Sequence, residues 1–218
     1  MKILLIEDRP ERQKQFLKKT GIDIVSYRFI DNKTENEYKS LKNELLVNIS
    51  ILEEYDIIIS HRSAFGIDNA KIIDAIKNYC ETNKKYLILF SGGISTSYYT
   101  KTPYEYLSLN SKDFYSDNLK LFLDNIQKNN DINLLLLTFG EQWELNLILN
   151  IFEKLNTVNY DDIDDYDALN DKINITSIDR FIDLTRFKDK DEISLKDIQD
   201  IKHLISKYIN KELGIHYA

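Results

Sequence analysis

Short apolar runs alternate with longer amphipathic stretches in the first part of the chain. Between the runs, apolar residues recur every three or four positions, as they do on one face of a helix. The run DIIIS at 56–60 has no polar alternation, which is typical of a strand buried on both faces of a parallel sheet. The runs predict five buried strands, at 2–6, 22–29, 56–60, 86–90 and 106–111. This pattern predicts an α/β fold with a five-stranded, doubly wound parallel sheet of the flavodoxin or receiver type.

Local signals mark where several helices begin and end. Pro10 suits the first turn of a helix, and Gly21 suits the position just past its end. Thr34 and Glu37 form a capping-box pattern before the next helix. The stretch 94–103 is rich in Ser, Thr and Tyr, and we expect a poor or short helix there.

After residue 130 the alternation of strands and helices stops. The strongly apolar stretch 132–155 predicts one helix, or two helices with a break near Gly140. Ser194, with Asp197 three residues later, predicts the start of a final helix.

Two parts follow from this pattern, an α/β domain at 1–128 and a mainly helical interaction region at 129–218. The composition is that of a globular protein, with 43% hydrophobic and 30% charged residues among 218. The one cysteine, Cys80, excludes an internal disulfide and a Cys-based zinc site. No apolar run is long enough for a membrane span, so we expect a cytoplasmic protein without a membrane partner.

The net charge of −7 is concentrated in one segment. Residues 159–171 contain six aspartates and no Lys or Arg, so the rest of the chain is almost neutral. Proteins that bind nucleic acid carry a basic surface, which this distribution does not provide. We therefore expect no nucleic-acid partner, and we interpret the acidic run as a solvated loop.

Polar residues that could bind a ligand or take part in catalysis follow four of the predicted strands. Glu7 and Asp8 come after the first strand, His61 after the third, Ser91 after the fourth and Lys112 after the fifth. Ligands of open α/β sheets bind at the carboxyl ends of the strands. We therefore expect these five side chains to form one pocket.

This arrangement resembles the receiver domain of bacterial response regulators. In that family an acidic pair after the first strand holds Mg²⁺, and an aspartate after the third strand accepts a phosphoryl group. A Ser or Thr follows the fourth strand and a Lys follows the fifth. The resemblance covers 1–128 and assigns Glu7 and Asp8 to the acidic pair, Ser91 to the hydroxyl position and Lys112 to the lysine.

His61 departs from the family pattern, because it stands where the phosphoacceptor aspartate belongs. Phosphorylation of the family type needs a carboxylate that attacks phosphorus and also binds Mg²⁺. A neutral imidazole cannot act as that oxygen ligand. The proline usual after the lysine is Asp113 here. The resemblance therefore implies a pseudo-receiver, in which the fold is kept and the phosphotransfer chemistry is lost.

We expect a non-catalytic regulatory or adaptor protein that acts by protein–protein interaction, in bacterial signalling or as a subunit of a larger system. The apolar residues of 134–155 cover more than one stripe of a helix. This density predicts contact with a partner protein, or with a second copy of the chain in a homodimer. The candidate interface residues are Leu119, Phe122, Trp143, Leu145, Ile148 and Phe152.

Other interpretations stay open. An enzyme, either a hydrolase or a phosphotransfer enzyme, could take its nucleophile and base from four residues, Asp8, Ser60, His61 and Ser91. No GxSxG elbow, P-loop or GxGxxG motif supports it. Glu7 and Asp8 could cap the following helix or bind Mg²⁺ weakly, and we expect no other cofactor. His61 could also be structural, as a hydrogen-bonding partner of Asp8.

Overall fold

The computed structural model describes residues 1–33, 37–101, 103–161, 163–212 and 214. The chain divides into two compact units, Met1–Glu141 and Gln142–Ala218. This division falls later than the boundary after residue 128 that the sequence suggested. Part of the predicted capping box, which begins at Thr34, lies outside the described residues.

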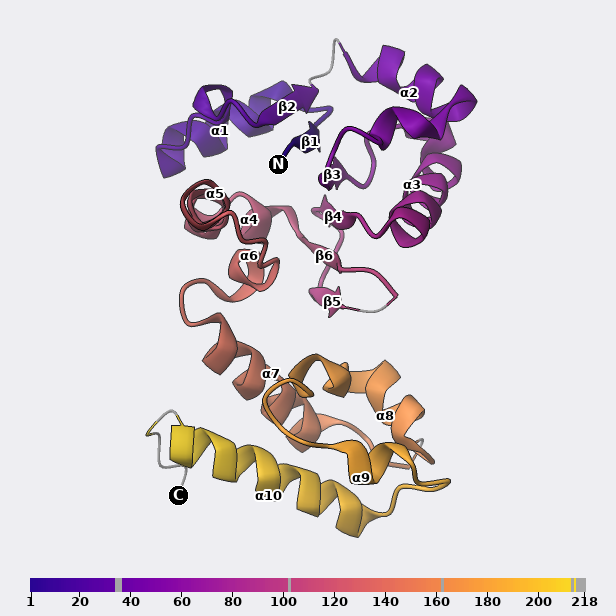
Figure 1. Ribbon diagram of the computed structural model, residues 1–218, viewed down its shortest axis with the longest axis vertical. Coiled ribbons are helices and arrows are strands. Elements are labelled where there is room, and N and C mark those ends of the chain that lie inside the picture. Colours follow the sequence, from indigo (N-terminus) through magenta and orange to yellow (C-terminus); the bar gives the residue numbers. More distant parts are fainter. Residues whose placement is uncertain (34–36, 102, 162, 213, 215–218) are drawn as a thin grey trace. The chain divides into compact units, whose positions relative to one another are not determined.

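The first unit contains a six-stranded sheet in the order β2-β1-β3-β4-β6-β5 (Figure 1). The five parallel strands are β1 (Ile3–Ile6), β2 (Ile30–Lys33), β3 (Ile57–His61), β4 (Tyr86–Ser91) and β6 (Tyr106–Asn110). The sixth strand, β5 (Tyr98–Thr100), pairs antiparallel with β6 at one edge. The predicted α/β class is confirmed, and the predicted count of five strands is wrong. Tyr and Thr favour strands, which explains why β5 forms where we expected a short helix.

The second strand also lies later than predicted. Residues 22–29 contain a short 3₁₀ helix, η1 (Ile24–Ser26), and a turn instead of a strand. The strand itself, β2, has the polar sequence IDNK and pairs only with β1. An edge strand does not need apolar side chains on both faces, so the pattern of apolar runs could not reveal it.

Helices cover both faces of the sheet. On one side lie α1 (Pro10–Thr20) and α5 (Asp117–Asn129), and on the other lie α2 (Tyr38–Val47) and α3 (Asn69–Asn83) (Figure 1). Four short helices complete the unit: η2 (Ile49–Leu52), η3 (Gly66–Asp68), α4 (Ser111–Phe114) and α6 (Leu135–Phe139).

The central strands supply the core of the first unit. Every residue of β1 and β3 is buried, as expected for parallel strands that helices cover on both faces. Leu4, Ile6 and Ile58 belong to one apolar cluster with residues of α2 and α3. Side chains alternate along a strand, so Leu5 points to the opposite face. Gly21 has a φ of 69° and ends α1 as predicted, because glycine tolerates this left-handed conformation.

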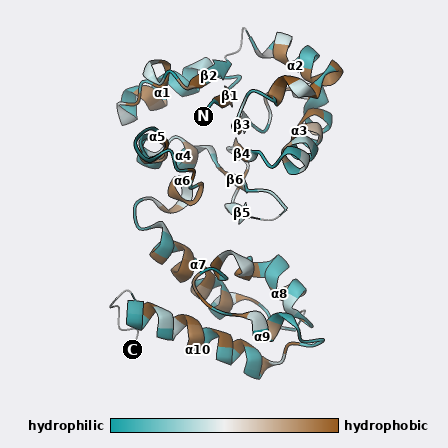
Figure 2. Cartoon of the chain, in the orientation of Figure 1, coloured by the Kyte–Doolittle hydropathy of each residue, from teal (hydrophilic) through white to brown (hydrophobic). Residues whose placement is uncertain are grey.

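The described residues of the second unit form helices joined by turns and loops. These helices are α7 (Trp143–Thr157), α8 (Tyr166–Ile173), η4 (Ile175–Ile178), α9 (Thr185–Lys188) and α10 (Leu195–Glu212). Helix α10 packs on α7, and apolar and hydrophilic bands alternate along it (Figure 2). Its buried isoleucines recur at intervals of three and four: Ile198, Ile201, Ile205 and Ile209.

Gly140 separates α6 from α7. Its φ is 69°, and an added Cβ would come within 3.0 Å of the side chain of Asn118. Of the two alternatives that the sequence left open for this stretch, the structure therefore has two helices with a break.

Burial corrects half of the predicted interface. Leu119, Phe122 and Ile148 are buried within the fold, with exposed fractions of 2%, 0% and 0%. Elements of their own unit cover them, since α5 lies on the sheet and packs on α6 (Figure 1), and α7 packs on α10. A partner cannot contact them in the folded chain. The other three candidates are half-buried: Trp143, Leu145 and Phe152.

Among the described residues, no helix has the length and apolar character that crossing a membrane requires.

Candidate functional site

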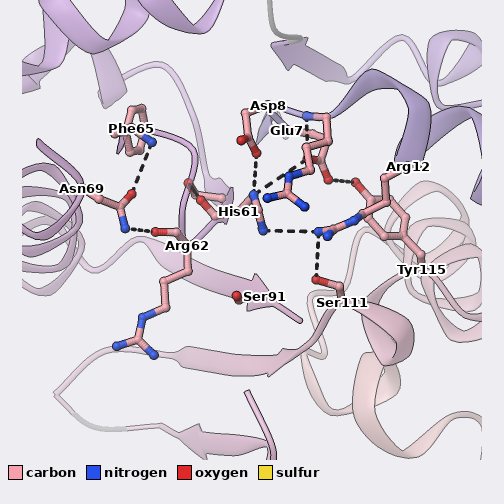
Figure 3. Close-up of polar contacts among 12 residues, drawn as sticks. Glu7, Asp8, Arg12, His61, Arg62, Phe65, Asn69, Ser91, Ser111 and Tyr115 are labelled. Atoms are coloured by element: carbon pink, nitrogen blue, oxygen red, sulfur yellow. Dashed lines mark hydrogen bonds and ion pairs between the residues drawn. The ribbon is translucent and has the colours of Figure 1, made fainter. Parts of the chain in front are cut away.

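A cluster of polar side chains lies at the carboxyl end of the sheet (Figure 3). Glu7 and Asp8 directly follow β1, and His61 is the last residue of β3. Arg12 comes from the first turn of α1, and Ser111 is the first residue of α4. Parallel strands bring their carboxyl ends to one edge of a sheet, so residues distant in sequence meet there.

Both ring nitrogens of His61 have a polar neighbour. Nδ1 lies 2.5 Å from Oδ1 of Asp8, and Nε2 lies 3.3 Å from Nη1 of Arg12. A guanidinium can only donate hydrogen bonds, so Nε2 must accept. The hydrogen-bond pattern therefore assigns the ring proton to Nδ1, which donates it to Asp8. The hydrogen bond to Asp8, one of the alternatives that the sequence left open for His61, is present.

Glu7 is fully buried, and each of its carboxylate oxygens accepts a hydrogen bond. Oε1 accepts from the backbone N–H of Arg9 at 2.9 Å, and Oε2 accepts from the hydroxyl of Tyr115 at 2.7 Å. Burial raises the pKa of Glu7 above its ordinary value, although the hydrogen bond from Tyr115 opposes the change.

The pKa of Asp8, the next residue, changes in the opposite direction. Its side chain is 19% exposed. Partial burial favours the neutral acid, but hydrogen bonds, above all the one from His61, outweigh burial and hold the pKa of Asp8 below its ordinary value. Two adjacent carboxyl groups thus differ in environment. Burial raises the pKa of Glu7, and the hydrogen bond from His61 lowers the pKa of Asp8.

Aromatic rings enclose the cluster. The ring of Phe90 lies 5.4 Å from His61 and stacks on Phe114 with centroids 4.2 Å apart. Phe16 stacks on Tyr115 at 4.6 Å. His61 itself is only 2% exposed. In such an apolar enclosure hydrogen bonds are stronger than in water, and an unpaired polar group is correspondingly costly.

Two residues of the predicted pocket lie outside this hydrogen-bonded cluster, which corrects the prediction. The hydroxyl of Ser91 accepts a hydrogen bond from the backbone N–H of Gly93 at 3.4 Å, and Figure 3 shows Ser91 apart from the other side chains. Lys112 is exposed on α4, and no ion pair joins it to Asp8 within the described part of the chain. The chain turns into α4 directly after β6, so Ser111 faces the cluster and Lys112 points elsewhere.

Three residues of the cluster were not among the predicted site residues. Arg12 stands four positions after Asp8, at the N-terminal turn of a helix that begins next to the strand ends, and this position is a signal that could have found it. Ser111 and Tyr115 carry no comparable signal. Their roles depend on how α4 places them, and α4 has only four residues.

A metal ion is the ligand that three of these side chains could in principle hold. Glu7, Asp8 and His61 each offer a ligand atom, and these atoms lie within 4.8 Å of one another. The present arrangement does not fit Mg²⁺, which prefers oxygen ligands and keeps several waters. The Glu7 oxygens already accept hydrogen bonds, and Nδ1 of His61 carries a proton that a metal would have to displace.

Comparison of the chain with protein-family models, with curated proteins and with solved structures gave no significant match. The resemblance to receiver domains therefore rests on the residues of this chain alone.

Proposed function

We propose that this protein is a non-catalytic regulatory or adaptor protein built on a pseudo-receiver domain. The observation that carries the proposal is the position and bonding of His61. It stands at the end of β3, where the family has its phosphoacceptor, and its two nitrogens contact Asp8 and Arg12. No carboxylate is present there to attack phosphorus. The polar groups that would surround a phosphorylation site satisfy one another instead.

The order of the strands supports the resemblance to receivers. The five parallel strands run β2-β1-β3-β4-β6, which is the order of doubly wound sheets of flavodoxin type. The acidic pair after β1 is also in its expected place. Two features depart from the family pattern, the added strand β5 and the outward position of Lys112.

Burial argues against the alternative of an enzyme that uses these residues. A catalytic base must come within hydrogen-bond reach of its substrate, and His61 is 2% exposed. The hydroxyl of Ser60 donates to the carbonyl of His61 at 3.3 Å and not to its ring. Ser60 and His61 thus do not form an accessible pair of nucleophile and base.

Phosphoryl transfer from a small donor tests the proposal. We expect no added phosphoryl group on the protein after incubation with acetyl phosphate and Mg²⁺, as measured by intact mass. A well-behaved receiver domain in the same reaction is the positive control. A stoichiometric, acid-labile adduct on wild type would overturn the proposal.

The interaction partner we propose is a second copy of the chain, through the second unit. Trp143, Leu145 and Phe152 are half-buried on α7 and remain candidates for this contact. Light scattering at micromolar concentration should give a mass near twice 25.7 kDa. A mass that stays at 25.7 kDa over a wide concentration range would exclude the homodimer and leave a different protein as the partner.

A further inference from the structure

Arg12 occupies a central position in the cluster (Figure 3). One terminal nitrogen, Nη1, lies 3.3 Å from Nε2 of His61 and also 3.3 Å from the hydroxyl of Ser111. Arg12 comes from α1, His61 from β3 and Ser111 from α4. The guanidinium therefore links three elements at the end of the sheet.

The contact with Arg12 determines which nitrogen of His61 carries the proton. A neutral imidazole has one N–H and one free lone pair. Arg12 needs the lone pair at Nε2, so the proton stays on Nδ1. Nδ1 is the nitrogen that faces both carboxyl groups, 2.5 Å from Asp8 and 3.9 Å from Glu7.

A metal ion would require the opposite arrangement. An ion held by Glu7, Asp8 and His61 must bind Nδ1, and the imidazole proton would then move to Nε2. There it would meet the N–H groups of Arg12, which cannot accept it. The permanent positive charge of Arg12 would also repel a divalent cation in this largely buried environment.

We infer that Arg12 is a positioning residue that sets the tautomer of His61 and closes a latent metal site formed by Glu7, Asp8 and His61. Two carboxylates and one imidazole suit Zn²⁺ and related transition metals, and they suit Mg²⁺ poorly. The inference deepens the proposed function and rests on it. In a pseudo-receiver, the guanidinium of Arg12 would keep the former phosphorylation pocket closed to metal ions.

Metal titration of Arg12 variants tests the inference, with Co²⁺ and Zn²⁺ as probes. Arg12→Met removes the charge and the donors but keeps a long side chain. We expect it to bind one equivalent of Co²⁺, seen by visible absorption, at least about tenfold more tightly than wild type, which is the usual size of effects on metal affinity from neighbouring groups. Zn²⁺ should displace the Co²⁺.

Two further variants serve as controls. Arg12→Lys keeps a cationic donor and should behave like wild type. Arg12→Met combined with His61→Ala should lose the gained affinity, because it lacks the imidazole ligand. The inference is overturned if wild type binds Co²⁺ through His61 as tightly as Arg12→Met does, or if folded Arg12→Met binds none.

A second measurement needs no variant. Long-range ¹H–¹⁵N correlation spectra of wild type distinguish a protonated ring nitrogen from one with a free lone pair. We expect His61 to show the proton on Nδ1 and the lone pair on Nε2. A proton on Nε2 would overturn the inference but leave the proposed function intact. Phosphoryl transfer to wild type would overturn the proposed function but not the tautomer assignment.

Discussion

Each unit of this protein has a network built on a buried acidic residue, and the two networks are assembled differently. In the first unit Glu7 meets Tyr115 across 108 positions of sequence, and Asp8 meets His61 across 53. In the second unit Asp197 meets Ser194 and Lys190, only three and seven positions away. The first network forms only when the sheet has formed. The second needs little more than the start of one helix.

The difference also sets how much each network contributes to stability. Removing one partner from a buried, charged network leaves the other partner uncompensated and costs about 3–5 kcal/mol. Removing a helix cap costs about 1 kcal/mol. Mutations in the first network should therefore destabilise the unit as a whole, and mutations in the second should act on α10 alone.

The largest effect should come from His61→Asp, which places three carboxyl groups together and removes the partner of Asp8. We expect the free energy of unfolding at neutral pH to fall by about 3 kcal/mol without metal. Mg²⁺ that binds only the folded variant should restore part of this loss, because a third carboxylate in place of the imidazole offsets the positive charge of Arg12. Thermal melts with and without Mg²⁺ measure both effects. Equal Mg²⁺ shifts in wild type and variant would show that the site geometry is wrong.

Replacing a tyrosine by phenylalanine in each unit compares the two units with the same chemical change. Tyr115→Phe removes the hydroxyl that donates to buried Glu7, and Tyr208→Phe removes one that donates to half-buried Glu144. We expect Tyr115→Phe to cost about 2 kcal/mol, because a buried acceptor loses its partner. Tyr208→Phe should change stability by about 0.5 kcal/mol or less, because water can replace the hydroxyl. Urea unfolding checks this pair, and equal losses would contradict the comparison.

A smaller effect should follow Ser194→Ala at the start of α10. The Ser194 hydroxyl accepts from the N–H of Asp197 at 3.2 Å, and an Asp197 oxygen accepts from the N–H of Ser194 at 3.0 Å. We expect a loss of about 1 kcal/mol, with Ser194→Thr close to wild type. Hydrogen exchange should show the loss in α10 and leave β1 and β3 unchanged. Increased exchange in these strands would mean that the capping network is not local.

The smallest effect concerns pH, and it has opposite signs at two adjacent residues. The lowered pKa of Asp8 adds stability that is complete above about pH 3.9 and is lost as pH falls below that ordinary value. The raised pKa of Glu7 acts the other way, since stability is lost as pH rises from about 4.3 through the raised value. Unfolding measured against pH should therefore show opposite changes of slope in Asp8→Asn and Glu7→Gln. Changes of the same sign would contradict the assignment.

The contrast between the two networks also explains which features the sequence could predict. The strands β1, β3 and β4 form continuous apolar runs and were predicted almost to the residue, because both of their faces are buried. The edge strands β2 and β5 were missed because one is polar and the other has three residues. The capping pair Ser194 and Asp197 was predictable, since both partners lie within one helical turn.

Of the candidate site, the sequence could predict only the residues that lie at the ends of strands. Glu7, Asp8 and His61 meet because each directly follows or ends a parallel strand. The prediction for Lys112 was wrong by one residue. Ser111, the residue before it, is the one that faces the cluster. The position of Arg12 at the start of the helix after β1 could have identified it. The contact of Tyr115 depends on how α4 packs against the sheet, and no local pattern encodes that packing.

We conclude above all that the imidazole of His61 is enclosed and has a hydrogen-bonding partner at each nitrogen. The decisive measurement is the accessibility of this side chain in the native protein. Diethyl pyrocarbonate modifies accessible neutral histidines, and His203 on the exposed side of α10 is an internal reference. Peptide mapping of the native protein should show modification at His203 and none at His61, which should react only after unfolding. Modification of His61 at the rate of His203 in the native protein would contradict the account.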